Sequence, residues 1–308
     1  MRTVVVGLGV QGAKRIGVAG DDLVATVDPI VPEADSKSIQ YVPLDSYDAA
    51  ILCTPDQVKL ELLDYLLSRG KHVLVEKPLL FPDVEQLHRL EELANSTGAA
   101  CYTAYNHRFE PHLVRVKELL DTGILGEIYL VRMFYGNGTA LDVKRSPWRN
   151  EGTGVVQDIG SHLLDSILFF FGPEERKFEA WSLSKFENPS FDHALFGSPG
   201  QPLVELEATL LSWKNNFQLD VLGELGSAHV SGLCKWGPST FTVRKRVFPS
   251  GVPEEQVQTI ECPDPTWELE YEHFKELCSK GATNLENDRW INSALIEIDR
   301  SATVGQIR

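Results

Sequence analysis

The chain of 308 residues is 43% hydrophobic and 24% charged, which is typical of a soluble globular protein long enough for two domains. Its formal net charge of −15 argues against a nucleic-acid-binding protein, because phosphate backbones are bound by basic surfaces. No apolar run approaches the roughly 20 residues needed to cross a bilayer, and a strand-like N-terminus leaves no room for a signal peptide. The five cysteines are scattered without a C-x-x-C pair, so we expect a reduced, cytoplasmic protein with neither a disulfide framework nor a metal site.

The region up to residue 120 alternates between short apolar, β-branched runs and segments with helical periodicity. The apolar runs predict buried parallel strands at residues 3–6, 23–27, 49–53, 72–75 and 100–105. The helical patterns lie between them, at residues 11–18, 56–70 and 83–98. This alternation predicts an N-terminal α/β domain, residues 1–120, with a parallel sheet and right-handed crossovers. Residues 29–47 have no helical stripe, and we expect a loop there with at most one short strand.

Beyond residue 120 the pattern changes to strand-like segments separated by Gly, Pro and Asn turns. These segments are residues 127–137, 177–186, 204–213, 216–232 and 240–248. Strong helical patterns occur at residues 154–171, 266–280 and 286–303. The sequence therefore predicts an α+β domain, residues 121–308, in which an open antiparallel sheet has helices on one face. An uncovered sheet of this size would expose an apolar face, which favours a homodimer or homotetramer.

A glycine motif, G-x-G-x-x-G, follows the first predicted strand and opens the first predicted helix at Gly7, Gly9 and Gly12. Gly7 permits the tight turn, Gly9 lets the backbone approach a pyrophosphate, and Gly12 allows close packing of helix on strand. The motif alone also fits a glycine-rich turn without a ligand. Asp28 ends the next strand, where a carboxylate accepts hydrogen bonds from ribose hydroxyls and repels a 2′-phosphate. The two features together predict a Rossmann dinucleotide site that favours NAD over NADP.

A lysine follows the fourth predicted strand in the sequence Glu76-Lys77-Pro78. Open α/β sheets bind ligands at the carboxyl ends of their strands, and Pro78 biases Lys77 toward an extended backbone. A surface lysine that merely ends a strand is the alternative interpretation.

The helical segment 154–171 carries Asp158, His162 and Asp165 at spacings of four and three residues, which places them on one helical face. Neighbouring carboxylates raise the basicity of an imidazole and orient its ring. A solvent-facing polar stripe is the alternative interpretation of the same spacing.

Five motifs in this order resemble those of the Gfo/Idh/MocA oxidoreductases, named for glucose–fructose oxidoreductase, inositol dehydrogenase and a rhizopine-catabolism protein. The motifs are GLGVQG, CTPD, GKHVLVEKPL, YNHRFEP and GTGVVQDIGSHLLD, which together span residues 7–165. The resemblance implies a nucleotide-binding N-terminal domain and a C-terminal open sheet, which members often use for oligomer contact. It further implies oxidation or reduction of a carbinol on a sugar, cyclitol or sugar nucleotide.

The resemblance also implies roles for individual residues. Lys77 matches the active-site lysine, His162 the proton-transferring histidine, and Asp158 the acid that contacts substrate or tunes the pair. Asp165 would hold the helix or the imidazole. The implied cofactor-binding residues are Gly7, Gly9, Val10, Gln11, Gly12, Asp28, Thr54, Pro55, Glu76, Lys77 and Asn106. The implied substrate-binding residues are Lys77, Arg108, Trp148, Arg149, Asp158 and His162, and further candidate sugar contacts are Trp181, Trp213, Lys235 and Trp236.

Four departures from the family pattern stand out. Lys59 replaces a common histidine, Thr153 interrupts the usual run of three glycines, and His107-Arg108 replaces an arginine pair. The short segment 29–47 affects the shape of the adenine pocket and therefore the cofactor preference.

The sequence is best interpreted as an NAD-dependent oxidoreductase that transfers hydride to or from a secondary carbinol. Two alternatives stay open: a cofactor-binding regulator of the same fold that has lost turnover, and an NAD-dependent glycosidase. Such a glycosidase oxidises its substrate only transiently, so it would not accumulate NADH.

Overall fold

A computed structural model describes residues 1–146 and 152–305 of the chain. It contains two compact units: the first comprises Met1–Asn106 and Thr266–Asn292, and the second comprises His107–Pro265 and the residues after Asn292. This division differs from the boundary expected at residue 120, because a segment near the C-terminus returns to the first unit. Local periodicity carries no signal for such a return, which is set by tertiary packing. In the described part of the chain, no helix is long and apolar enough to span a membrane.

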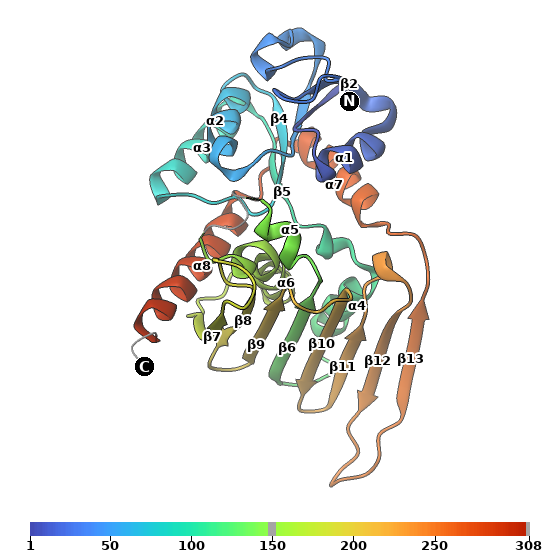
Figure 1. Ribbon diagram of the computed structural model, residues 1–308. Helices are drawn as coiled ribbons and strands as arrows, with labels where there is room; N and C mark the ends of the chain where they lie inside the picture. Colours follow the sequence, from blue (N-terminus) through green and yellow to red (C-terminus); the bar gives the residue numbers. More distant parts are fainter. Residues whose placement is uncertain (147–151, 306–308) are drawn as a thin grey trace. The chain divides into compact units, whose positions relative to one another are not determined.

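The first unit is built on a five-stranded parallel sheet with the order β2-β1-β3-β4-β5 (Figure 1). Its strands are β1 (Thr3–Val6), β2 (Leu23–Val27), β3 (Ala49–Leu52), β4 (His72–Glu76) and β5 (Cys101–Ala104). Each strand starts and ends within one residue of its predicted bounds, which confirms the Rossmann-type sheet. The residues that follow these strands therefore lie at one edge of the sheet, where their carboxyl ends meet.

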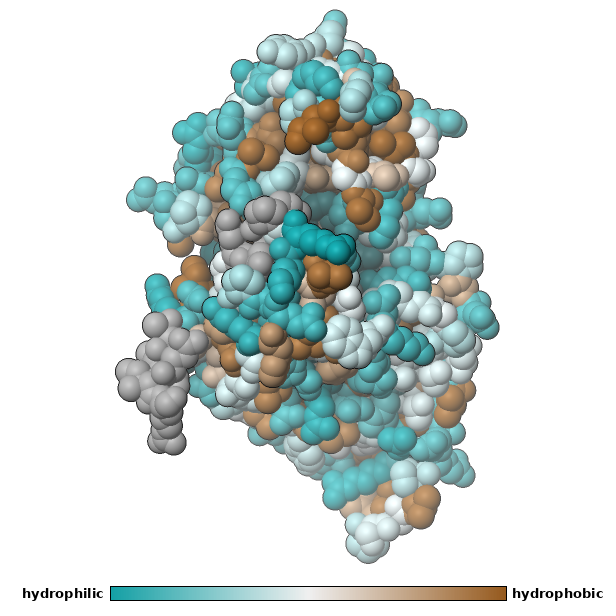
Figure 2. Space-filling view, viewed as in Figure 1, coloured by the Kyte–Doolittle hydropathy of each residue, from teal (hydrophilic) through white to brown (hydrophobic). Residues whose placement is uncertain are grey.

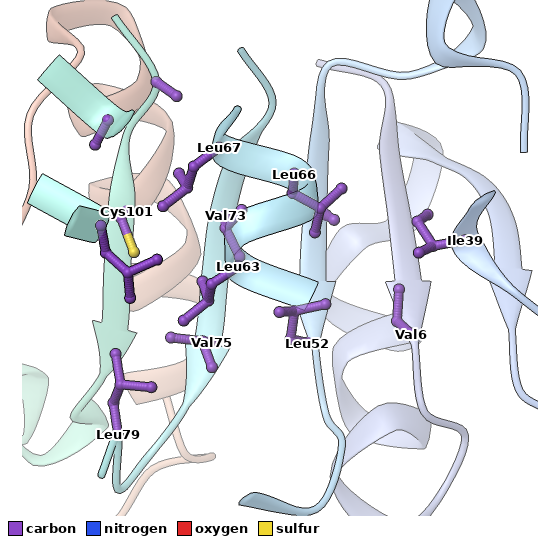
Figure 3. Packing of buried hydrophobic residues seen from close by; sticks show 14 of the residues in the cluster. Val6, Ile39, Leu52, Leu63, Leu66, Leu67, Val73, Val75, Leu79 and Cys101 are labelled. Atoms are coloured by element: carbon purple, nitrogen blue, oxygen red, sulfur yellow. The ribbon is translucent and has the colours of Figure 1, made fainter. Parts of the chain in front are cut away.

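Two pairs of helices cover the two faces of this sheet. Helices α2 (Asp56–Leu67) and α3 (Val84–Thr97) pack their leucines on one face, and α1 (Val10–Ala19) and α7 (Thr266–Lys280) cover the other. In Figure 3, Leu63 and Leu66 lie against Leu52 and Val73, all of them fully buried. Such burial of leucine and valine contributes about 1.5–3 kcal/mol per side chain to stability.

The segment 29–47 contains no α-helix. It forms two short 3₁₀ turns, Ile39–Tyr41 and Leu44–Ser46, and one isolated bridge that pairs Ser36 with Val27. The carboxylate of Asp35 accepts hydrogen bonds from the amide and the hydroxyl of Thr26, and so fixes the segment beside β2.

The second unit contains an eight-stranded sheet with the order β13-β12-β11-β10-β6-β9-β8-β7 (Figure 1). The strands are β6 (Ile128–Gly136), β7 (Glu179–Ser184), β8 (His193–Ser198), β9 (Leu203–Thr209), β10 (Asn216–Gly223), β11 (Gly226–Ser231), β12 (Ser239–Lys245) and β13 (Glu255–Ile260). All neighbouring pairs are antiparallel except β6 and β9, which are parallel. The predicted antiparallel sheet is thus confirmed as a mostly antiparallel, mixed one.

The helices of the second unit are α4 (Pro111–Asp121), α5 (Ala140–Lys144) and α6 (Ser161–Phe171), together with the C-terminal part of α8 (Leu285–Gly305). The helical segment expected at residues 154–171 begins with a π turn, Val156–Gly160, that continues into α6. Helix α4 lies against β11 and β12, and the π turn lies against β9. Alternate residues of the central strands are buried, among them Val131, Met133 and Leu219.

The opposite face of this sheet carries charged pairs among partly exposed apolar side chains such as Leu130 and Phe134. Arg132 on β6 pairs with Glu205 on β9 at 2.8 Å, and Arg244 on β12 pairs with Glu255 on β13 at 2.7 Å. Between them, His229 contacts Asp220 at 2.6 Å. The face is thus mixed rather than uniformly apolar, because charged pairs on neighbouring strands lie between its apolar side chains. On the side of the molecule seen in Figure 2, hydrophilic residues predominate, and hydrophobic ones form separate groups.

Candidate active site

The glycine turn after β1 has the geometry that its sequence predicts. Gly7 has a φ of +89°, and a Cβ atom there would lie 2.5 Å from the carbonyl oxygen of Cys53. A Cβ atom on Gly12 would lie 1.9 Å from the carbonyl oxygen of Gly7, so α1 packs on the turn only with glycine at this position. A Cβ atom on Gly9, by contrast, would meet no atom within 4 Å. The backbone at Gly9 is thus open to a ligand.

The side chain of Asp28 is hydrogen-bonded to the backbone of this turn. One carboxylate oxygen accepts a hydrogen bond from the Leu8 amide at 2.8 Å, and the other accepts from the amides of Ile30 and Val31. Burial alone would raise the pKa of Asp28, but these backbone donors outweigh it and lower the pKa. The carboxylate is therefore ionised at neutral pH and fixed beside the glycine turn.

The neighbouring residues fit a dinucleotide. Helix α1 begins at the turn without a side-chain cap, which leaves amide groups for phosphates, and Val10 and Gln11 in its first turn are exposed. After β3, the buried hydroxyl of Thr54 has no hydrogen-bond partner among the described residues, as expected where a ligand supplies one. Pro55 follows it as an exposed residue that precedes α2.

Lys77 directly follows β4, so it lies at the carboxyl edge of the same sheet. The adjacent Glu76 accepts a hydrogen bond from the buried Arg15 of α1 at 2.7 Å, and Arg15 also bonds Glu270 of α7 at 2.7 Å. Burial opposes the charge on Arg15, but the two carboxylates outweigh it and raise the pKa of Arg15. Glu76 thus anchors the lysine segment to the helix of the glycine turn.

Asn106 follows β5 and is almost fully buried. Its amide nitrogen donates to the hydroxyl of Thr266 at 2.8 Å. The side chain thus joins the end of β5 to the start of α7.

In the second unit, His162 of α6 lies in a cluster of rings. Its ring stacks on His107 with centroids 4.3 Å apart and an interplanar angle of 21°. Tyr135 of β6 lies against both histidines, and Trp236 contacts Tyr135 at a centroid distance of 5.4 Å. These aromatic contacts fix the plane of the His162 ring.

Lys235 completes this cluster, with its ammonium nitrogen 3.2 Å from His107 Nε2 and 3.5 Å from the Tyr135 hydroxyl. Burial lowers the pKa of Lys235 to about 8, although the carboxylates of Asp264 and Glu110 oppose the shift. An ammonium group donates and never accepts, so His107 accepts at Nε2.

Asp165, one turn after His162, is fully buried and binds Arg108. The guanidinium contacts both carboxylate oxygens, and its shortest bond is 2.7 Å. Burial raises the pKa of Asp165, and the Arg108 ion pair offsets part of that shift. The pair ties α6 to the segment before α4, so Asp165 holds the helix, and Arg108 is engaged within the protein.

The remaining predicted site residues are placed as follows. Asp158 lies in the π turn and is half-buried. Trp181 and Trp213 are exposed surface residues. Trp148 and Arg149 lie outside the described residues.

Sequence reasoning assigned no role to Tyr135 or His107, although both contact His162. Tyr135 comes from a strand that reads as ordinary apolar core, and its position beside the histidine depends on the pairing of distant strands. His107 was visible only as a departure from the family motif.

Two family descriptions match the chain. Residues 1–105 match the oxidoreductase family with an NAD-binding Rossmann fold, and residues 113–229 match the GFO/IDH/MocA C-terminal domain.

Among similar proteins is the uncharacterized oxidoreductase YdgJ of Escherichia coli (strain K12), which is 29% identical over 60% of this chain and 54% of its own length. The inositol 2-dehydrogenase of Rhizobium meliloti (strain 1021) is 28% identical over 49% of this chain and 41% of its own length. The chain thus spans about half the length of the curated relatives it matches.

Solved structures share the whole fold at low sequence identity. Levoglucosan dehydrogenase in complex with NADH and L-sorbose has a TM-score of 0.83 at 17% identity, covering 98% of this chain and 96% of that one. A putative myo-inositol dehydrogenase from Sinorhizobium meliloti 1021 has a TM-score of 0.78 at 17% identity, covering 99% of this chain and 98% of that one. With both halves matched, the chain belongs to the Gfo/Idh/MocA family of oxidoreductases and has that family's NAD-binding Rossmann domain.

Proposed function

We propose that this protein is an NAD-dependent dehydrogenase or reductase that acts on a secondary carbinol of a sugar, cyclitol or sugar nucleotide. The observation that carries the proposal is the position of Lys77, which follows β4 at the sheet edge where β1 ends in the glycine turn. A cofactor bound at this edge would place its nicotinamide beside Lys77. The ammonium group could then hydrogen-bond the oxygen of the carbinol that reacts. The names of the relatives, which include an inositol 2-dehydrogenase and a levoglucosan dehydrogenase, support this substrate class.

The chain's own residues supply the proton chemistry. NAD held by the glycine turn and Asp28 would supply the hydride acceptor or donor. In the oxidative direction, the neutral His162 ring takes the hydroxyl proton, and Lys77 hydrogen-bonds the same oxygen to stabilise its developing negative charge. Asp158 contacts the substrate or tunes the histidine, while the Arg108–Asp165 pair holds the helix that carries both residues.

A ligand panel followed by mutagenesis tests the proposal. The intact protein is screened by thermal shift and by absorbance at the NADH band, with NAD or NADP and with myo-inositol, aldohexoses and a nucleotide sugar. Lys77→Ala and His162→Ala should each lower kcat at least about a hundredfold, whereas the Kd for NAD stays within about threefold. His88→Ala on the surface of α3 is the control and should leave kcat unchanged.

The possible results separate the alternatives. Unchanged turnover in Lys77→Ala or His162→Ala would remove that residue from the mechanism. NAD binding without turnover on any compound of the panel would favour a cofactor-binding regulator. Cleavage of a glycoside without net NADH formation would identify an NAD-dependent glycosidase instead.

We further propose that the protein works as a homodimer or homotetramer in the cytoplasm. The eight-stranded sheet supports the oligomer, because its solvent-facing side carries the partly exposed Leu130, Phe134 and Leu222 among its charged pairs. The five free cysteines support the cytoplasmic location. Light scattering coupled to gel filtration measures the oligomeric state, and a monomer at all concentrations would exclude it.

A further inference from the structure

Lys59 lies in the first turn of α2 with its side chain only 3% exposed. Its ammonium nitrogen donates to the carbonyl oxygen of Glu76 at 2.6 Å and to that of Pro78 at 2.9 Å. It also contacts the carboxylate of Asp56 at 2.6 Å. An ammonium group has three N–H donors, so these three partners satisfy it completely.

This position is unfavourable for a cation. The N-terminal end of a helix carries a positive partial charge, and burial removes the ammonium from water. Burial lowers the pKa of Lys59, and the nearby charge of Lys77 acts in the same direction, whereas Asp56 and Glu76 oppose them. The lysine is stable there because the two carbonyl oxygens and Asp56 replace its hydration.

The two carbonyl groups that Lys59 binds belong to the residues on either side of Lys77. We propose that Lys59 is a positioning residue that clamps the backbone around Lys77 and so aims its ammonium group at the reacting oxygen. The clamp also joins the segment after β3, which includes Thr54 and Pro55, to the segment after β4. This inference rests on the proposed role of Lys77.

A second lysine offers a matched control at the opposite end of β4. Lys71 donates to the carbonyl oxygen of Tyr47 at 2.8 Å and is also partly buried. Like Lys59, it donates to a backbone carbonyl oxygen beside β4, but at the end of the strand away from the carboxyl edge of the sheet. Lys71→Met should affect stability without affecting catalysis.

The clamp itself is tested by hydrogen exchange, which needs no enzymatic activity. Lys59→Met keeps most of the length of the side chain but removes its donors. The amides of residues 76–81, measured in a peptide covering residues 72–81, should therefore exchange at least about tenfold faster. Lys71→Met should leave the amides of residues 76–81 unchanged. Protection at residues 76–81 that is equal in Lys59→Met and the wild type would overturn the clamp, whatever Lys77 does.

The catalytic consequence is tested by a double-mutant cycle, with NAD and myo-inositol or the faster substrate that the panel identifies. Lys59→Met should lower kcat about 10- to 100-fold, because small misplacements of a reacting group are costly, while KM for both substrates changes less than about threefold. In a Lys77→Ala background, the same substitution should have no further effect. Lys59→Arg, which keeps the charge and the donors, should restore much of kcat.

Each result has a definite meaning. An equal loss of kcat from Lys59→Met in both backgrounds would show a purely structural role and overturn the inference. Unchanged kcat in Lys59→Met would also overturn it. Unchanged kcat in Lys77→Ala would refute the proposed function, while the exchange measurement still decides whether the clamp exists. If Lys59→Met does not fold, Lys59→Gln, which retains one amide donor group, takes its place in both measurements.

Discussion

Asp28 is the side chain that we propose links the fold to cofactor choice. Its carboxylate accepts three backbone hydrogen bonds, one of them from Leu8 inside the glycine turn. A carboxylate has about four acceptor positions, so capacity is left for a ribose hydroxyl. The same negative charge would oppose a 2′-phosphate, so we expect the residue to favour NAD.

Asp28→Asn should therefore weaken NAD binding and relax the selectivity. The amide retains a single acceptor oxygen, so we expect the Kd for NAD to rise about tenfold, as for the loss of a charge-assisted hydrogen bond. The Kd for NADP should rise less or fall, since the repulsion is removed. Titration calorimetry with both cofactors measures the ratio.

Asp35→Asn is the matched control for that substitution. Asp35 fixes the same region through Thr26 but does not contact the glycine turn. It should lower stability without altering the ratio of the two Kd values. A ratio that changes equally in both variants would assign selectivity to the shape of the segment rather than to the Asp28 charge.

At the scale of elements, the glycines in and before helix α1 have different surroundings, which fit helix packing at one position and ligand binding at another. Gly12 has no room for a Cβ atom because the carbonyl of Gly7 is in contact, whereas Gly9 has open space at the same end of the helix. Gly17 also has open space, but it lies about one and a half helical turns beyond Gly12, away from the glycine turn.

Alanine substitutions at these three positions should give three different results. Gly12→Ala should lower Tm by about 5 °C or more, because the added methyl overpacks the contact of α1 with β1. Gly9→Ala should keep Tm within about 2 °C, since its φ of −71° suits alanine, but raise the Kd for NAD at least about tenfold. Gly17→Ala should stabilise the helix by up to about 1 kcal/mol without affecting NAD. Thermal unfolding and NAD titration of the three variants check this, and NAD affinity retained in Gly9→Ala would contradict the pyrophosphate role.

The elements differ in how far the sequence alone predicts them, and the reason is burial. Strands β1, β3 and β5 of the first unit are buried on both faces, so their unbroken apolar runs mark them to within one residue. Strand β13 is exposed almost throughout, and β8 contains glycine and serine, so neither was predicted. Helix α4 was also missed, because its charged residues obscure the short buried stripe of His112, Leu113 and Val116. The same limit applies to the site: motif residues were found, but Tyr135 and the carbonyl partners of Lys59 depend on tertiary contacts.

At the scale of the whole molecule, the Rossmann unit is discontinuous in sequence. Tyr271 and Phe274 of α7 are buried in the core beneath β1, β3 and β4. Asn284 donates to the carbonyl oxygen of Thr103 and accepts from its amide, so it pairs with β5 much as a neighbouring strand would. Asp288 accepts from the Thr103 hydroxyl at 2.8 Å. Residues 266–292 therefore complete the sheet's second face, which α1 alone covers only in part.

A fragment of residues 1–106 should consequently fail to fold on its own, because an uncovered apolar face favours aggregation. A single chain that joins Asn106 to Thr266 and ends at Asn292 should fold. The two ends to be joined are in hydrogen-bond contact at 2.8 Å, so a Gly/Ser linker of about five residues spans them. Circular dichroism melts and NAD titration of both proteins provide the measurement. The joined protein should melt cooperatively and bind NAD, whereas a cooperative, NAD-binding 1–106 fragment would show that α7 and the start of α8 are dispensable.

Substituting Phe274→Ala in the joined protein should lower its stability by about 3–5 kcal/mol, since the ring is fully buried against the sheet.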